Sequence, residues 1–124
     1  MTDKELNIGK DFNRDPGGRF YTDGAGSGEE FREKHLKPAI EALEGDQTLT
    51  VILDDDVEML GSSFLVEGFA GLVRYGYCTR EEFQEKIVLK WSDPDFEFFA
   101  RRIKEYVQRA DFDSAEYIPS NSKS

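Results

Sequence analysis

Leu49-Thr50-Val51-Ile52-Leu53, followed directly by Asp54-Asp55-Asp56, is the stretch of sequence that decides the fold. Its first five residues are all apolar or β-branched, and such residues favour β-strands. A strand without polar alternation is typical of a sheet that has helices covering both of its faces. We therefore predict a central, buried strand at residues 49–53 that ends at the acidic turn.

The residues after the acidic turn predict a helix that begins at Gly61-Ser62-Ser63 and runs to about Tyr75. Its apolar residues surround nearly the whole helix: Phe64, Leu65, Val66, Phe69, Ala70, Leu72 and Val73. A helix of this composition is deeply buried or forms part of a docking surface. Gly76 is suited to end it, because glycine readily adopts the left-handed conformation that follows many helices.

The N-terminal third predicts a hairpin and then a helix. Residues 6–12 and 19–21 are extended stretches separated by the turn Asp15-Pro16-Gly17-Gly18. Ser27 begins a helix that ends near Gly45, and Ser27 and Glu30 form its capping box. Pro38 is expected to bend this helix. Two outward ion pairs are predicted on it, Glu30 with Lys34 and Glu33 with Lys37.

The C-terminal half predicts a short helix, a strand and a final helix. Thr79 and Glu82 form a second capping box, and residues 87–91 are β-rich. The final helix, at residues 94–110, carries an apolar stripe at spacings of three and four: Phe96, Phe99, Ile103, Tyr106 and Ala110. The predicted fold is an α/β domain at residues 1–110 with a mixed sheet and the order β-β-α-β-α-α-β-α, followed by a loosely ordered tail at 111–124.

Composition excludes several classes of function. The 124 residues suit one domain, and 16 basic against 26 acidic residues give a net charge of −10, which repels nucleic acids and anionic membranes. Cys78 is the single cysteine, residues 1–5 lack the features of a signal peptide, and no apolar run approaches the roughly 20 residues that cross a bilayer. We expect a cytoplasmic protein that binds neither nucleic acid nor membrane.

Three stretches resemble bacterial STAS-like proteins, which are related to the STAS domain of anti-sigma-factor antagonists. They are Pro16-Gly17-Gly18-Arg19, the run from Ser27 to Arg32, and the run from Gly61 to Arg74. The resemblance implies a STAS-like mixed sheet with helices. It also implies a regulatory protein that works by contact with another protein, without catalysis, metal or cofactor.

The resemblance places a candidate site at the start of the apolar helix. In the antagonists, this loop reads Asp-Ser-Ser-Gly, and a partner kinase with a histidine-kinase-type ATPase fold phosphorylates a serine in it. Ser63 aligns with that serine, whereas Gly61 stands in place of the aspartate and Phe64 in place of the glycine. The departures favour docking of a protein partner, such as an ATPase of this type, over phosphorylation.

The candidate residues for partner binding or switching are therefore Ser62, Ser63, Phe64 and Glu67. Either serine could instead cap the helix by accepting a hydrogen bond from a backbone N–H in its first turn. Glu67 is the lone acid in an apolar helix, so we expect it to bind the Ser63 hydroxyl or a basic group elsewhere in the fold.

Other interpretations remain open from the sequence. Asp54–Asp56 could hold Mg²⁺ in a small metal-dependent enzyme, although neighbouring side chains of an extended chain point in opposite directions. The glycines at 24, 26 and 28 miss the spacing of nucleotide-binding loops. The negative charge could make the protein a decoy or inhibitor of a basic nucleic-acid-binding protein. His35 and Cys78 lie in no recognisable catalytic setting.

Overall fold

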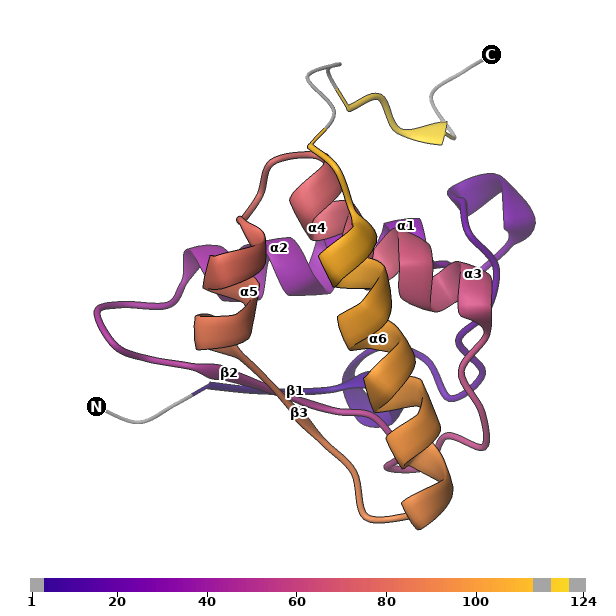
Figure 1. Ribbon diagram of the computed structural model, residues 1–124. Helices are drawn as coiled ribbons and strands as arrows, with labels where there is room; N and C mark the ends of the chain where they lie inside the picture. The colour runs from indigo at the N-terminus through magenta and orange to yellow at the C-terminus, as the bar shows by residue number, and fades with distance from the viewer. Residues whose placement is uncertain (1–3, 113–116, 121–124) are drawn as a thin grey trace.

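The structure is a computed structural model that describes residues 4–112 and 117–120. Within these residues, three parallel strands form one sheet in the order β1-β2-β3 (Figure 1). The strands are β1 (Lys4–Asn7), β2 (Leu49–Ile52) and β3 (Ile87–Lys90). The prediction of a central strand at residues 49–53 is confirmed, because β2 pairs with both neighbours. Of the tail that we expect to be loosely ordered, residues 113–116 and 121–124 lie outside the described residues.

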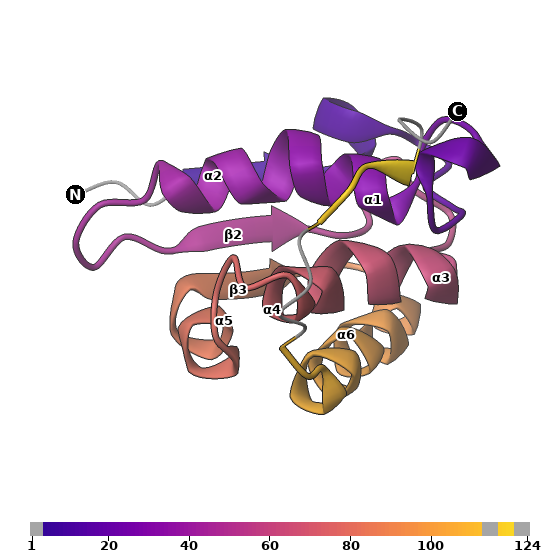
Figure 2. The same cartoon turned by 90° about the horizontal axis from the view of Figure 1, so that it is seen from above.

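The two faces of the sheet differ in their surroundings. In both views, the labelled helices lie over one face, and β2 buries Leu49 and Val51 against them (Figures 1 and 2). On the opposite face, Ile52 is half-buried and the Val88 side chain is 45% exposed. The expectation of helices on both faces is therefore wrong for the described residues. Thr50 and Ile52, the β2 side chains on this second face, are only half-buried.

The predicted N-terminal hairpin and mixed sheet are wrong. β1 pairs in parallel with β2, and the chain continues into the helical turns η1 (Ile8–Phe12) and η2 (Tyr21–Asp23). The Asp23 carboxylate accepts hydrogen bonds from the backbone N–H groups of Arg19 and Phe20 at 3.0 and 2.9 Å. Because side-chain oxygens take these donors, residues 19–21 do not form a β ladder.

One long helix crosses the sheet in three consecutive segments, α1 (Gly28–Phe31), η3 (Arg32–Leu36) and α2 (Lys37–Glu41). The Ser27 hydroxyl caps it by accepting from the Glu30 N–H at 3.1 Å, as predicted, but the Glu30 carboxylate accepts from the Gly26 N–H, so the predicted capping box is only half formed. In η3, the Lys37 N–H donates to the Arg32 carbonyl, which widens the turn immediately before Pro38. This local departure fits a proline ring that would clash with the preceding turn of a regular helix.

A second long helix packs closely against the first, again in three segments, α3 (Ser62–Leu65), η4 (Val66–Ala70) and α4 (Gly71–Arg74). A Cβ atom on Gly28 would lie 2.6 Å from the Phe64 carbonyl oxygen and 2.8 Å from the Gly68 nitrogen. The two helices can therefore approach to this distance only because residue 28 is glycine.

The C-terminal elements are α5 (Arg80–Lys86), η5 (Pro94–Phe96) and α6 (Glu97–Arg109). The predicted capping box of α5 is confirmed, with Thr79 and Glu82 each accepting from the other's backbone N–H at 3.0 Å. Phe96 of η5 and three residues of α6 are buried: Ala100, Ile103 and Val107. The other members of the predicted stripe, Phe99, Tyr106 and Ala110, pack half-buried beside them. None of the helices in the described residues is long and apolar enough to cross a membrane.

Candidate functional site

The two serines of the candidate site lie at the beginning of α3. Gly61 occupies the N-cap position in an extended conformation, which leaves Ser62 exposed and Ser63 half-buried. Among the residues that the structure describes, neither hydroxyl takes part in a hydrogen bond, including the bonds that would cap the helix. The capping interpretation is therefore not supported, and both hydroxyl groups are uncommitted.

Phe64 belongs to the core and not to the surface of the site. Its side chain is fully buried, and its ring centroid lies 5.4 Å from that of Phe31 and 6.1 Å from that of Phe12. A partner that binds this segment in the observed conformation cannot touch the ring. Phe64 was predicted to bind a partner, but in the structure its ring packs in the core and holds the start of α3 in place.

Glu67 is also buried, with 3% of its surface exposed, and it pairs with Arg32. The Arg32 Nη1 donates to the Glu67 carboxylate and to the Glu67 carbonyl oxygen, each at 2.7 Å. The expectation that Glu67 would bind a basic group elsewhere in the fold is confirmed. Gly71 makes room for this pair, because a Cβ atom there would lie 2.5 Å from Nη1.

Arg32 is the centre of a buried polar cluster that extends to Glu33 and Tyr77. The Arg32 Nε and the Tyr77 hydroxyl both donate to the same oxygen of Glu33 at 2.7 Å. Burial opposes the charged form of Arg32, but the hydrogen bonds with Glu33 and Glu67 outweigh it and raise the pKa of the guanidinium. Burial and the Glu33 carboxylate raise the pKa of Tyr77. At neutral pH, Arg32 is therefore charged and Tyr77 keeps its phenolic proton.

Sequence reasoning missed this cluster. It predicted an outward Glu33–Lys37 pair, which is wrong, because the Glu33 side chain turns inward and is 15% exposed. The predicted Glu30–Lys34 pair is present, with Lys34 Nζ 3.4 Å from the Glu30 carboxylate. The signal that could have revealed Arg32 was Glu67 itself, since a lone acid in an apolar helix needs a buried cation.

Asp54, Asp55 and Asp56 point to three different parts of the chain. Asp54 accepts from the backbone N–H groups of Ser92 and Asp93 at 2.7 and 2.6 Å. Asp55 binds the Asn7 amide and the Lys10 ammonium, and Asp56 pairs with Arg14, as follows: Asn7 Nδ2 at 2.9 Å, Lys10 Nζ at 3.2 Å and Arg14 Nε at 2.9 Å. The carboxylates therefore tie loops together.

No group of three or more His, Cys, Asp and Glu residues that could hold a metal ion occurs in residues 4–112 and 117–120. The glycine-rich loop also uses its backbone donors internally. The Gly28 N–H donates to the Gly18 carbonyl, and the Gly26 N–H donates to the Glu30 carboxylate. The geometry favours neither the metal-dependent enzyme nor a nucleotide loop.

His35 and Cys78 are structural. His35 packs edge-on against Phe12, with ring centroids 5.2 Å apart, and burial lowers the pKa of its imidazole. Cys78 is a buried free thiol whose pKa burial raises to about 11. The Cys78 thiol is therefore protonated at neutral pH, which makes it a weak nucleophile.

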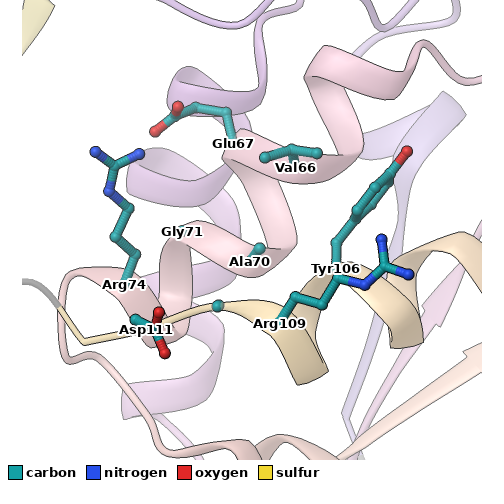
Figure 3. A pocket seen from close by; sticks show the side chains of 9 residues that line it. Val66, Glu67, Ala70, Gly71, Arg74, Tyr106, Arg109 and Asp111 are labelled. Carbon is teal, nitrogen blue, oxygen red and sulfur yellow. The ribbon is translucent and has the colours of Figure 1, made fainter.

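A hollow of about 350 Å³ lies between η4, α4 and the end of α6 (Figure 3). Its floor is apolar and includes Val66, Ala70 and Tyr106. The guanidinium groups of Arg74 and Arg109 extend away from one another in Figure 3, so they do not converge on one anion. The hollow therefore lacks the arrangement of a phosphate or carboxylate site.

The fold and the site define an α/β domain with a parallel sheet, a helical layer over one face, and a serine pair opening a buried helix. The chain belongs to the family of the STAS-like domain of unknown function (DUF4325), whose sequence profile matches residues 27–96. The predicted resemblance to STAS-like proteins is thereby confirmed. The search of curated proteins and the search of solved structures found no match.

Proposed function

We propose that this protein is a non-catalytic regulatory module that binds a protein partner through the loop 57–61 and the serines that follow it. The observation that carries the proposal is the state of Ser62 and Ser63, whose hydroxyl groups are uncommitted within the described residues. Met59 supports it, because its side chain is 64% exposed beside the serines. A partner that covers this loop would remove the apolar Met59 side chain from water, which favours binding.

The loop 57–61 and the start of α3 are fixed to the core by buried side chains. Val57, Leu60 and Phe64 are 6%, 2% and 0% exposed, so alternate parts of the loop are fixed in the core. Met59 and Ser62 therefore project from a surface that is already ordered, which lowers the entropy lost on binding.

The resemblance to STAS-like regulators supports a histidine-kinase-type ATPase as the partner. Acidic residues surround the loop, among them the exposed Asp56 and Glu58, and they would attract a basic surface on that ATPase. Ser63 is half-buried, so a phosphate there would weaken docking through its bulk and through the cost of desolvating a dianion within the contact, even though its charge would attract a basic partner. Phosphorylation of Ser63 would thus act as a conditional switch on docking.

The test is a binding titration of a histidine-kinase-type ATPase from the native host against the full chain. Met59→Asp and Ser63→Asp should each weaken binding about tenfold or more, because one places charge at an apolar contact and the other imitates the modified serine. Gln84→Asp on α5 is the matched control, since it adds the same charge at an exposed position away from the loop.

Unchanged affinity of both loop variants would overturn the proposed docking site. Loss of binding at high salt, with no effect of either loop substitution, would instead favour an acidic decoy of a basic protein.

A further inference from the structure

A buried carboxylate, Glu29, is held by the C-terminal part of the described chain. Glu29 is 1% exposed, and its oxygens accept from the Tyr117 hydroxyl at 2.5 Å, the Ser120 N–H at 2.9 Å and the Ser120 hydroxyl at 2.5 Å. The Tyr21 N–H donates to it at 2.8 Å. Figure 2 shows the segment 117–120 running across α1, from which it is far apart in sequence. Most donors to this carboxylate therefore come from the segment.

Tyr117 also completes the surroundings of Arg32. The Arg32 Cζ lies 4.6 Å from the Tyr75 ring centroid and 4.9 Å from that of Tyr117, and the two centroids are 5.0 Å apart. The guanidinium and the two rings thus contact each other in a triangle, with cation–π attraction on two sides. Arg32 Nη2 is buried and has no hydrogen-bond acceptor among the described residues. The two aromatic rings are therefore the groups that stabilise this side of the guanidinium.

These contacts select for particular chemistry at two positions. A phenol satisfies both buried groups, because its ring contacts Arg32 while its hydroxyl donates to Glu29. Three residues later, a small side chain with a hydroxyl donates to the other carboxylate oxygen. A phenylalanine in place of the tyrosine would keep the ring contact and leave the buried carboxylate short of a donor.

We propose that Glu29, Arg32, Tyr75 and the Tyr21 backbone form a binding groove for a polypeptide segment with tyrosine followed three residues later by serine. Residues 117–120 occupy the groove as an intramolecular ligand. The groove contains neither Ser62 nor Ser63, so the inference goes beyond the proposed function and is independent of it.

The occupant lies on the surface, above the buried groups that it contacts. Ile118 is 58% exposed, and Tyr117 and Ser120 are half-buried, whereas Glu29 and Arg32 beneath them are at most 1% exposed. When the segment leaves, the groove presents an under-satisfied carboxylate and one open side of the guanidinium. A second segment that supplies the same phenol and hydroxyl would satisfy both groups.

The experiment uses the full chain with Tyr117→Ala and Ser120→Ala, which removes the internal ligand's anchors. The probe is a fluorescent synthetic peptide, Ala-Glu-Tyr-Ile-Pro-Ser-Asn, which copies residues 115–121. Fluorescence anisotropy should show binding to the double variant and at least tenfold weaker binding to the wild-type chain, whose own segment competes. Replacing the tyrosine of the peptide with phenylalanine should weaken binding about tenfold.

A double variant that retains the wild-type circular dichroism spectrum and does not bind the peptide would overturn the proposal. A second measurement on the wild-type chain is independent of that variant's folding. Hydrogen exchange at the Ser120 amide should be slowed by its bond to Glu29 and accelerate about tenfold in Glu29→Gln. Glu81→Gln, an exposed substitution on α5, is the control. An unprotected Ser120 amide in the wild-type chain would equally refute the groove.

Discussion

The buried Arg32–Glu67 pair gives the sharpest test of how the fold is held together. The two side chains are 0% and 4% exposed, and the Arg32 Nη1 lies 2.7 Å from the Glu67 carboxylate. Arg32→Met would leave that carboxylate buried, with the partly exposed Arg19 as its nearest cation at 4.0 Å. Breaking a buried pair by removing one partner typically costs about 3–5 kcal/mol, and we expect that loss in the free energy of unfolding.

Glu67→Met should cost less than Arg32→Met. Removal of the Glu67 carboxylate leaves Arg32 paired with Glu33, whose carboxylate lies 2.7 Å from Arg32 Nε and is only 15% exposed. We expect a loss of about 1–3 kcal/mol, because the guanidinium keeps one charged partner. The double variant should recover part of the stability, since replacing a buried ion pair by apolar side chains of similar volume is often close to neutral.

The assay is urea denaturation followed by the fluorescence of Trp91, the single tryptophan. The double-mutant cycle should yield a coupling energy of about 1–3 kcal/mol between the two side chains. A coupling near zero, or losses below about 0.5 kcal/mol for both single variants, would refute the reasoning that this pair is desolvated and mutually dependent.

Three further outcomes follow from the same geometry. Gly71→Ala should lower the free energy of unfolding by about 1–3 kcal/mol, because the new methyl group would overlap Arg32 Nη1, whereas Gly17→Ala, whose new methyl group would have no atom within 4 Å, should be nearly silent in the same urea titration. Burial would raise the pKa of Glu29, but hydrogen bonds from Ser120 and Tyr117 outweigh it and hold that pKa below its usual range. The stability that ionised Glu29 contributes is therefore present above its unfolded-state pKa and is lost as the pH falls through the lower folded-state value. Glu29→Gln should flatten this dependence of stability on pH, and an unchanged slope between about pH 5 and 2 would contradict the prediction. Because burial raises the pKa of the Cys78 thiol to about 11, its alkylation by iodoacetamide at pH 8 should be at least about tenfold slower in the native chain than in urea, and equal rates would show an accessible thiol.

Features that depend on neighbours in sequence were predicted well. Thr79 with Glu82 and Ser27 with the Glu30 N–H cap their helices as expected, because each interaction spans three residues. The apolar run at 49–53 also predicted a strand in the centre of the sheet, although one face of that strand is only half-buried. The start of α3 at Ser62 followed from Gly61 and the apolar residues beyond it.

The hairpin failed because alternation in residues 6–12 says nothing about which strand they pair with. In the structure, the chain at Gly9 instead passes so close to the Asp55 carbonyl that a Cβ atom would lie 1.9 Å from its oxygen, a contact between distant parts of the chain that alternation cannot reveal. The sequence also left open whether Phe64 lies in the core or on a docking surface. On a helix that is apolar nearly all round, only packing shows which side faces the core.

The sequence by itself determined the longer helices, the caps of α1 and α5, the central strand and the position of the serine pair, since these depend on local periodicity and backbone hydrogen bonding. Only the tertiary structure decided that Arg32 meets Glu67 across 35 positions and that Tyr117 meets Glu29 across 88. A charged residue on a helix looks the same in sequence whether it is solvated or buried. Its partner is selected by the close crossing of two helices at Gly28 and Gly71, which no local pattern encodes.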